Sequence, residues 1–263
     1  MIVNTTHAPG TFCWPELSTT DQAAAEKFYG TLFGWSVAKT EMGPDAHYTI
    51  FQLDGNPAAA AAKQDPEQKK MGIPPNWLSY VSTPDVDASI EKVKKLGGNI
   101  MAGPFDVMEH GRMAVATDPT GAVFALWQAK QHPGVGVLDE NNSLVWTELY
   151  TDDAKKAGAF YQELFGWTGE DFPGNANYTV LKRGDAMAGG MMEKTPDMKD
   201  VPNHWTVYYG VADLDAAVAK IQSLGGKLMH GPMEVEGVGR MAFVTDPQGA
   251  NFAVLQFAEK PKG

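Results

Sequence analysis

Residues 28–35 read FYGTLFGW, and residues 160–167, which lie 132 positions later, read FYQELFGW. The segment WPEL at 14–17 returns at the same shift as WTEL at 146–149. Because several separate matches keep their order and one common shift, the chain contains a duplicated unit rather than a chance repeat.

The later part of each copy repeats at a shift of 128 positions. GRMA at 111–114 returns at 239–242, and TDPTGA at 117–122 returns as TDPQGA at 245–250. The drop in shift from 132 to 128 indicates a four-residue deletion in the second copy. The protein is therefore predicted to be a tandem duplication with halves of about 130 residues.

A polar segment separates the two copies. It contains one proline and two glycines before the run DENN at 139–142, and it carries no periodic apolar pattern. We predict a first domain at residues 8–130, a linker at 131–142 and a second domain at 143–259.

The composition excludes several classes of protein. The 263 residues are 43% hydrophobic and 20% charged, with a formal net charge of −11, which argues against nucleic acid and anionic membranes as partners. The only cysteine is Cys13, which excludes an internal disulfide and fits a reducing compartment. Neither a signal peptide nor a run of about 18 apolar residues is visible, so we expect a cytoplasmic protein.

Each half is predicted to contain two modules of one strand, one helix and three strands. In the first module, Ala24, Phe28 and Leu32 recur at helical spacing before Gly34, and a second helical pattern spans residues 86–96. The expected fold class is α+β, with curved mixed sheets that form a cup and helices on the outer face. The concave face of such a sheet is a natural pocket for a small molecule.

The ordered motifs Trp-x-Glu-Leu, Phe-Tyr-x-x-Leu-Phe-Gly-Trp, Leu-Gly-Gly and Asp-Pro-x-Gly-Ala resemble those of the vicinal oxygen chelate superfamily. That superfamily includes glyoxalase I, bleomycin-resistance proteins and extradiol dioxygenases. The resemblance covers residues 10–256, occurs twice, and points to the tandem-domain, glyoxalase-like branch. It implies paired βαβββ modules around a site that often holds a divalent metal through His, Glu or Gln side chains.

The positions that match those metal ligands carry few donors. The first-strand positions fall at Trp14 and Trp146, and the last-strand positions fall at Ala125 and Ala253. Alanine coordinates no metal, and it stands at this position in both copies. We therefore expect no resident cofactor and no metal at the aligned positions, so that a divalent metal would need a non-standard site.

Glu16 and Glu148 are the candidate catalytic residues. Each lies two residues after the first-strand position and therefore on the same strand face. Buried in the cup, such a carboxylate would act as a general base or anchor a ligand. The alternative is a glutamate that faces solvent or bonds backbone amides.

Further residues are candidates for ligand binding: aromatic groups that would stack, tyrosines that would donate hydrogen bonds, a histidine that would pair with Glu148, and arginines that would bind an acidic group. The alternatives are core aromatics, a surface histidine and arginines paired with structural carboxylates. The ligand-binding candidates are Trp14, Tyr48, Trp77, Arg112, Trp146, Tyr178, His204 and Arg240.

Two functions remain open from the sequence. The first is a binding protein similar to the bleomycin-resistance branch, which would hold a small molecule in the cup without the usual metal. The alternative is a metal-dependent lyase, isomerase or dioxygenase of the superfamily that uses a shifted site. In either case a small molecule is the expected partner, and the duplicated chain is expected to be a monomeric pseudo-dimer or a weak homodimer.

Overall fold

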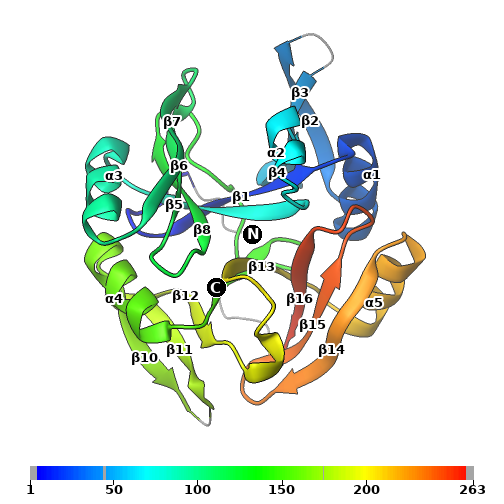
Figure 1. Cartoon of the computed structure of the whole chain (residues 1–263). Coiled ribbons are helices and arrows are strands. Elements are labelled where there is room, and N and C mark those ends of the chain that lie inside the picture. Colours follow the sequence, from blue (N-terminus) through cyan, green and yellow to red (C-terminus); the bar gives the residue numbers. More distant parts are fainter. Residues whose placement is uncertain (1–4, 44–45, 174, 259–263) are drawn as a thin grey trace.

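The computed structural model describes residues 5–43, 46–173 and 175–258. Two eight-stranded sheets form within these residues, one from each half of the chain, and Figure 1 shows them one above the other with helices at both sides of the junction. The α+β class and the tandem arrangement predicted from the repeat are confirmed.

The first half supplies one complete sheet and its helices. Its elements are β1 (Phe12–Thr19), α1 (Gln22–Phe33), β2 (Ser36–Gly43), β3 (Ala46–Leu53), β4 (Asn56–Lys63), α2 (Pro66–Lys70), β5 (Asn76–Ser82), α3 (Val86–Lys95), β6 (Asn99–Val107), β7 (Gly111–Thr117) and β8 (Val123–Ala129).

The second half repeats this order. Its elements are β9 (Leu144–Thr151), α4 (Ala154–Phe165), β10 (Thr168–Phe172), β11 (Asn175–Arg183), β12 (Ala186–Glu193), the short 3-10 helix η1 (Pro196–Met198), β13 (His204–Gly210), α5 (Leu214–Ser223), β14 (Lys227–Val235), β15 (Gly239–Thr245) and β16 (Asn251–Phe257).

Each sheet joins two βαβββ modules through their first strands. The strand order is β2-β3-β4-β1-β5-β8-β7-β6 in the first half and the equivalent β10-β11-β12-β9-β13-β16-β15-β14 in the second. Strand β1 is parallel to β4 and antiparallel to β5, and β5 is parallel to β8. The outer strands curve away from this central pair, so each sheet has one concave face (Figure 1).

Local sequence fixes where the first helix of each half begins and ends. The Asp21 carboxylate accepts a hydrogen bond from the Ala24 amide at the start of α1, and Gly34 ends the helix in the left-handed conformation with φ of 72°. Asp153 and Gly166 play the same two parts for α4. The repeated FGW motif is thus a helix stop followed by a tryptophan of the core.

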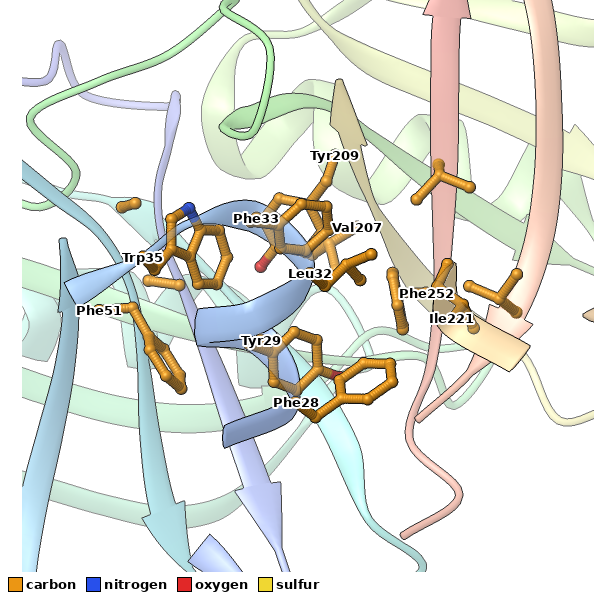
Figure 2. Close-up of a cluster of buried hydrophobic side chains, with 14 of the residues drawn as sticks. Phe28, Tyr29, Leu32, Phe33, Trp35, Phe51, Val207, Tyr209, Ile221 and Phe252 are labelled. Atoms are coloured by element: carbon orange, nitrogen blue, oxygen red, sulfur yellow. The ribbon is translucent and has the colours of Figure 1, made fainter. Parts of the chain in front are cut away.

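The convex faces of the two sheets pack against each other through these helices. Aromatic residues of α1 lie against β13, β16 and α5 of the other half, as Figure 2 shows for Phe28, Phe33, Tyr209 and Phe252. A second cluster joins α4 to α3, β5 and β8 in the same way. The two concave faces therefore point away from each other, and we name them cup 1 (first half) and cup 2 (second half).

Two tyrosine–aspartate hydrogen bonds link the halves at equivalent places. Tyr29 donates to Asp246 Oδ2 over 3.1 Å, and Tyr161 donates to Asp118 Oδ2 over 3.0 Å. Both aspartates begin the Asp-Pro-x-Gly turns, and both tyrosines belong to the repeated Phe-Tyr motif. The two sequence motifs that reveal the duplication are thus the ones that join its copies.

The prediction of Trp77 as a ligand-binding residue is corrected by this arrangement, and its repeat partner Trp205 is placed in the same way. Both indoles are buried in the core between the halves, where Trp77 Nε1 donates to Tyr29 over 3.2 Å and Trp205 Nε1 donates to Tyr161 over 2.9 Å. Side chains alternate between the two faces of a strand, and these two lie on the convex face. They support the domain junction and line neither cup.

Replacing Tyr161 by phenylalanine is expected to lower the free energy of unfolding by about 1–3 kcal/mol, because Asp118 Oδ2 and Trp205 Nε1 lose a buried partner. Urea denaturation would measure the change. Tyr209→Phe is the matched control, since the buried Tyr209 hydroxyl has no hydrogen-bond partner within the described part of the chain. That control should be neutral or stabilising, and equal losses in the two variants would contradict the role of the tyrosine–aspartate bond.

Candidate functional site

Cup 2 contains a hydrogen-bonded cluster centred on one carboxylate. Glu148 is 5% exposed and accepts from Tyr178 on Oε2 at 2.7 Å and from Tyr208 on Oε1 at 2.9 Å. Trp146 Nε1 donates to the Tyr178 hydroxyl at 2.9 Å, and the Tyr150 and Tyr208 hydroxyls lie 3.0 Å apart. Strands β9, β11 and β13 supply these five side chains.

Burial dominates the electrostatics of this cluster. It raises the pKa of Glu148 above the usual range, although the tyrosine hydrogen bonds to the carboxylate oppose the shift. Burial and the nearby carboxylate also raise the pKa values of Tyr150, Tyr178 and Tyr208, so these hydroxyls keep their protons. The cluster is therefore one proton acceptor surrounded by neutral donors.

Cup 1 repeats the centre of this arrangement. Tyr48 donates to Glu16 Oε2 at 2.5 Å, Trp14 Nε1 donates to Tyr48 at 3.0 Å, and Tyr80 is a further hydrogen-bond partner of Glu16. Burial raises the pKa of Glu16, again against the effect of its tyrosine partners. The position that matches Tyr150 is Ser18, so the chain of hydroxyls is shorter in this cup.

Apolar and aromatic side chains surround both clusters. In cup 2 the ring of Phe243 packs edge-on against Tyr150 and Tyr208, with ring centroids 6.1 Å and 5.9 Å apart. Partly buried Met241 and Phe257 extend this wall. A ligand in the cup would therefore meet aromatic faces around one polar centre, which is the usual composition of a small-molecule site.

The linker contributes to cup 1, which the sequence did not predict. The His132 ring lies edge-on to Trp14 with centroids 4.4 Å apart, and its carbonyl accepts from Trp127 Nε1 at 2.9 Å. His132 Nε2 is buried and has no partner among the residues the structure describes. Burial, with a smaller effect from His110 and His7, lowers the pKa of His132 to about 4. The imidazole is thus neutral and forms part of the wall of cup 1.

His204 lies at the edge of the cluster in cup 2. Its ring stacks on Tyr150 with centroids 5.3 Å apart, and its Nδ1 lies 2.8 Å from the carbonyl oxygen of Pro202. Burial lowers the pKa of His204. Among the described residues no hydrogen bond joins His204 to Glu148, so the structure does not form the predicted pair, and the histidine contacts the cluster only by stacking on Tyr150.

Arg112 and Arg240 lie on the other face of their strands, which corrects their prediction as ligand-binding residues. Arg112 makes a two-pronged ion pair with Asp87 of α3, with distances of 2.9 Å and 3.0 Å. Arg240 binds Asp215 of α5 in the same manner, at 2.8 Å and 3.0 Å. The next residue of β7, Met113, faces cup 1, and strand alternation turns Arg112 toward the helix.

The donor set of the cups does not fit the metal that the fold family implies. The residues that pair with Glu16 across the central strands are Ala60 and Leu78, and those that pair with Glu148 are Gly190 and Thr206. The last-strand alanines lie beside Tyr80 and Tyr208. Within residues 5–43, 46–173 and 175–258, no three His, Cys, Asp or Glu side chains gather in a geometry that would hold a metal ion.

Tyr80, Tyr208 and Tyr150 are site residues that sequence reasoning missed. The first two match each other at the shift of 128, and Tyr150 shares strand parity with Glu148, so the repeat carried a signal for them. The sequence-based prediction instead named Trp77, Trp146 and His204, which lie on the same strands as these tyrosines. Two small surface crevices lie elsewhere, beside the starts of α3 and α5, and include none of these tyrosines.

Gly190 makes room for the cluster in cup 2. A Cβ at this position would overlap the Tyr178 hydroxyl and come within 2.8 Å of Trp146 Nε1. Gly190→Ala is therefore expected to displace Tyr178 and to cost about 1–3 kcal/mol of unfolding free energy through lost hydrogen bonds and overpacking. Urea denaturation and tryptophan fluorescence would measure both effects. Gly158→Ala, where the nearest atom is Met191 Cε at 3.5 Å, is the control and should be neutral or stabilising.

Two tandem cups, each built from paired βαβββ modules and packed back to back, define a two-domain protein of the vicinal oxygen chelate fold. The chain belongs to the glyoxalase/bleomycin resistance protein/dioxygenase superfamily, whose model matches residues 11–126 and 143–254. The resemblance stated from the motifs is thereby confirmed.

Several relatives cover nearly the whole chain. One, named "Putative glyoxylase CFP32", from Mycobacterium tuberculosis, is 44% identical over 250 residues, which is 94% of this chain and 95% of that protein. The anthracycline biosynthesis protein DnrV from Streptomyces peucetius is 35% identical over 267 residues, covering 97% and 96% of the two chains.

Solved structures share the fold at low sequence identity. The Mn(II)-bound glyoxalase from Novosphingobium aromaticivorans has a TM-score of 0.66 at 14% identity and covers 96% of this chain and 83% of its own. The 2,3-dioxygenase LapB from Pseudomonas sp. KL28 has a TM-score of 0.65 at 11% identity, with 96% and 93% covered. Among the described residues, no helix is long and apolar enough to span a membrane.

Proposed function

We propose that the protein binds a small, planar, partly aromatic molecule in its cups without a resident divalent metal. One observation carries this proposal: a carboxylate held by tyrosine hydroxyls stands in each cup, half-buried at Glu16 and buried at Glu148, while the adjoining last-strand positions are Ala125 and Ala253. The aromatic walls suit a flat ligand, and the carboxylate centre gives it an orientation.

The relatives support an aromatic ligand. DnrV, which matches over almost its full length, is named for anthracycline biosynthesis, and anthracyclines are flat, hydroxylated polycyclic molecules. The proposal transfers only this chemical character to the present chain. A hydroxylated anthraquinone is therefore the first probe to use.

Titration with 2,6-dihydroxyanthraquinone at pH 6.5, followed by quenching of tryptophan fluorescence, tests the proposal. Trp14 and Trp146 lie in the cups and report on the bound probe. We expect saturable binding that survives dialysis against EDTA, with metal content measured on the same sample. Absence of binding, or stoichiometric metal whose removal abolishes binding, would overturn it.

A second candidate function is catalysis of proton transfer by Glu148. The buried carboxylate with its raised pKa is the observation that favours it, and relatives named as glyoxylases agree with an enzyme. This alternative includes the metal-dependent lyases, isomerases and dioxygenases of the superfamily with a shifted site. Exchange of the α-protons of hydroxyacetone for deuterium, followed by NMR, would detect the base, and Glu148→Gln should abolish that exchange.

A further inference from the structure

In the cup 2 cluster, every indole N–H and tyrosine O–H donates its hydrogen bond to another member of the cluster. The indole N–H of Trp146 is a donor only, and it points to the Tyr178 oxygen. Tyr178 and Tyr208 each own one hydroxyl proton, and both direct it to Glu148. The Tyr150 hydroxyl reaches both Glu148 and the Tyr208 oxygen, so one of these two acceptors takes its single proton.

The hydrogen-bond donors of the Glu16 cluster in cup 1 are likewise all used within that cup. Trp14 donates to Tyr48, and Tyr48 donates to Glu16. The Tyr80 hydroxyl lies within reach of Glu16 and of Met113 Sδ, at 3.9 Å from the sulfur, so either acceptor takes its one proton. No proton of either cluster remains to be donated to a bound molecule.

We propose that cup 2 selects ligands that are hydrogen-bond donors, such as phenols and aromatic amines, and rejects aromatic molecules that present only acceptors. Cup 1 shares the carboxylate cluster but also holds the neutral His132 imidazole, whose buried Nε2 has no partner among the described residues. With Glu16 and Glu148 ionised, each cluster offers its ligand only lone pairs, on the carboxylate and on tyrosine oxygens such as that of Tyr150. An ether, ketone or carboxylate oxygen placed there meets another lone pair, and burying a polar atom without a partner is costly. This inference names the ligand class of the proposed function and rests on it.

One added proton reverses the selection. If Glu148 is protonated, its O–H donates to one tyrosine oxygen, and that tyrosine no longer needs to donate to the carboxylate. On the Tyr208 side the released proton turns to Tyr150, which then directs its own proton outward. A glutamine amide has the same consequence at every pH, because its NH₂ group donates where the carboxylate accepted.

The groups that face Glu148 define the pH dependence. They are Tyr178 from β11, Tyr208 from β13, and Tyr150 from β9, with His204 stacked on the outer side of Tyr150. Trp146 does not titrate. The Glu→Gln variant keeps His204 and the three tyrosines, so comparison of the two proteins isolates the carboxylate.

Three naphthalenes of similar shape test the inference: 2-naphthol as donor, and 2-methoxynaphthalene and 2-acetylnaphthalene as acceptors. At pH 8 we expect 2-naphthol to bind the wild-type protein about tenfold or more tightly than either acceptor, since only the naphthol can donate a hydrogen bond to the charged cluster. Lowering the pH toward 5 should reduce this ratio. In the double variant Glu16→Gln/Glu148→Gln the preference should vanish or reverse and lose its pH dependence.

The outcomes separate the two proposals. Equal affinity of the wild-type protein for all three probes at pH 8 would overturn the donor selection while leaving aromatic binding intact. Failure of every probe to bind would remove the proposed function itself. If the double variant does not fold, the pH series on the wild-type protein decides alone, and a ratio that stays constant from pH 8 to 5 contradicts the role of the glutamates.

Discussion

Trp167→Ala is expected to lower the free energy of unfolding by about 3–5 kcal/mol, the usual cost of deleting a buried aromatic side chain. The indole is 1% exposed, packs with Phe12, Tyr161 and Trp205, and donates from Nε1 to the carbonyl of Gly10 at 2.7 Å. Its loss leaves a cavity at the junction of the two halves. Chemical denaturation monitored by circular dichroism measures the change.

An exposed aromatic residue provides the control for this substitution. Phe105 on β6 is 44% exposed, and Phe105→Ala should change the unfolding free energy by no more than about 0.5 kcal/mol. A Trp167→Ala protein as stable as the control would show that the junction between the halves contributes little to stability. The equivalent residue Trp35, which donates to the carbonyl of Asn142 at 2.8 Å, allows the measurement to be repeated at the other junction.

Glu148→Ala is expected to weaken binding of the anthraquinone probe in cup 2 by roughly 10–100-fold. The substitution removes the acceptor that orients Tyr178 and Tyr208, and hydrogen bonds to a charged group contribute about 1.5–3 kcal/mol each. Isothermal titration calorimetry gives both affinity and stoichiometry. Glu16→Ala tests cup 1 in parallel, so the pair of variants assigns each binding event to one cup.

Glu163→Gln is the matched control for the binding experiment. Glu163 is exposed on α4, on the side of the sheet away from cup 2, and its loss should leave the affinity unchanged. Unchanged probe affinity in both Glu148→Ala and Glu16→Ala proteins, each with a wild-type circular dichroism spectrum, would show that the carboxylates are not part of the binding site.

The duplication was readable because the repeated motifs perform the same local task twice. Gly34 and Gly166 both end a helix in the left-handed conformation, and Asp118 and Asp246 both begin the same turn. Such roles depend on residues close in sequence, so identical letters predict identical structure. The glutamates at cup parity were predicted for a similar reason, since side chains alternate along a strand.

Positions near strand ends were harder to assign to a face. Trp77 was predicted to lie in the ligand site, but one residue of offset along β5 turns its side chain into the core. Arg112 and Arg240 were misplaced for the same reason, because each neighbours a residue that faces the cup. A sequence pattern without register cannot distinguish the two faces where both are apolar.

The sequence by itself determined that the chain is two copies of one α+β unit, that each copy carries a glutamate on the cup face, and that both copies have alanine in the last strand, at Ala125 and Ala253. Only the tertiary structure decided that the copies pack by their convex faces, that Tyr178 and Tyr208 converge on Glu148, and that His132 of the linker reaches cup 1. The first set follows from local geometry and periodicity. The second depends on contacts between residues 30 or more positions apart, which packing alone brings together.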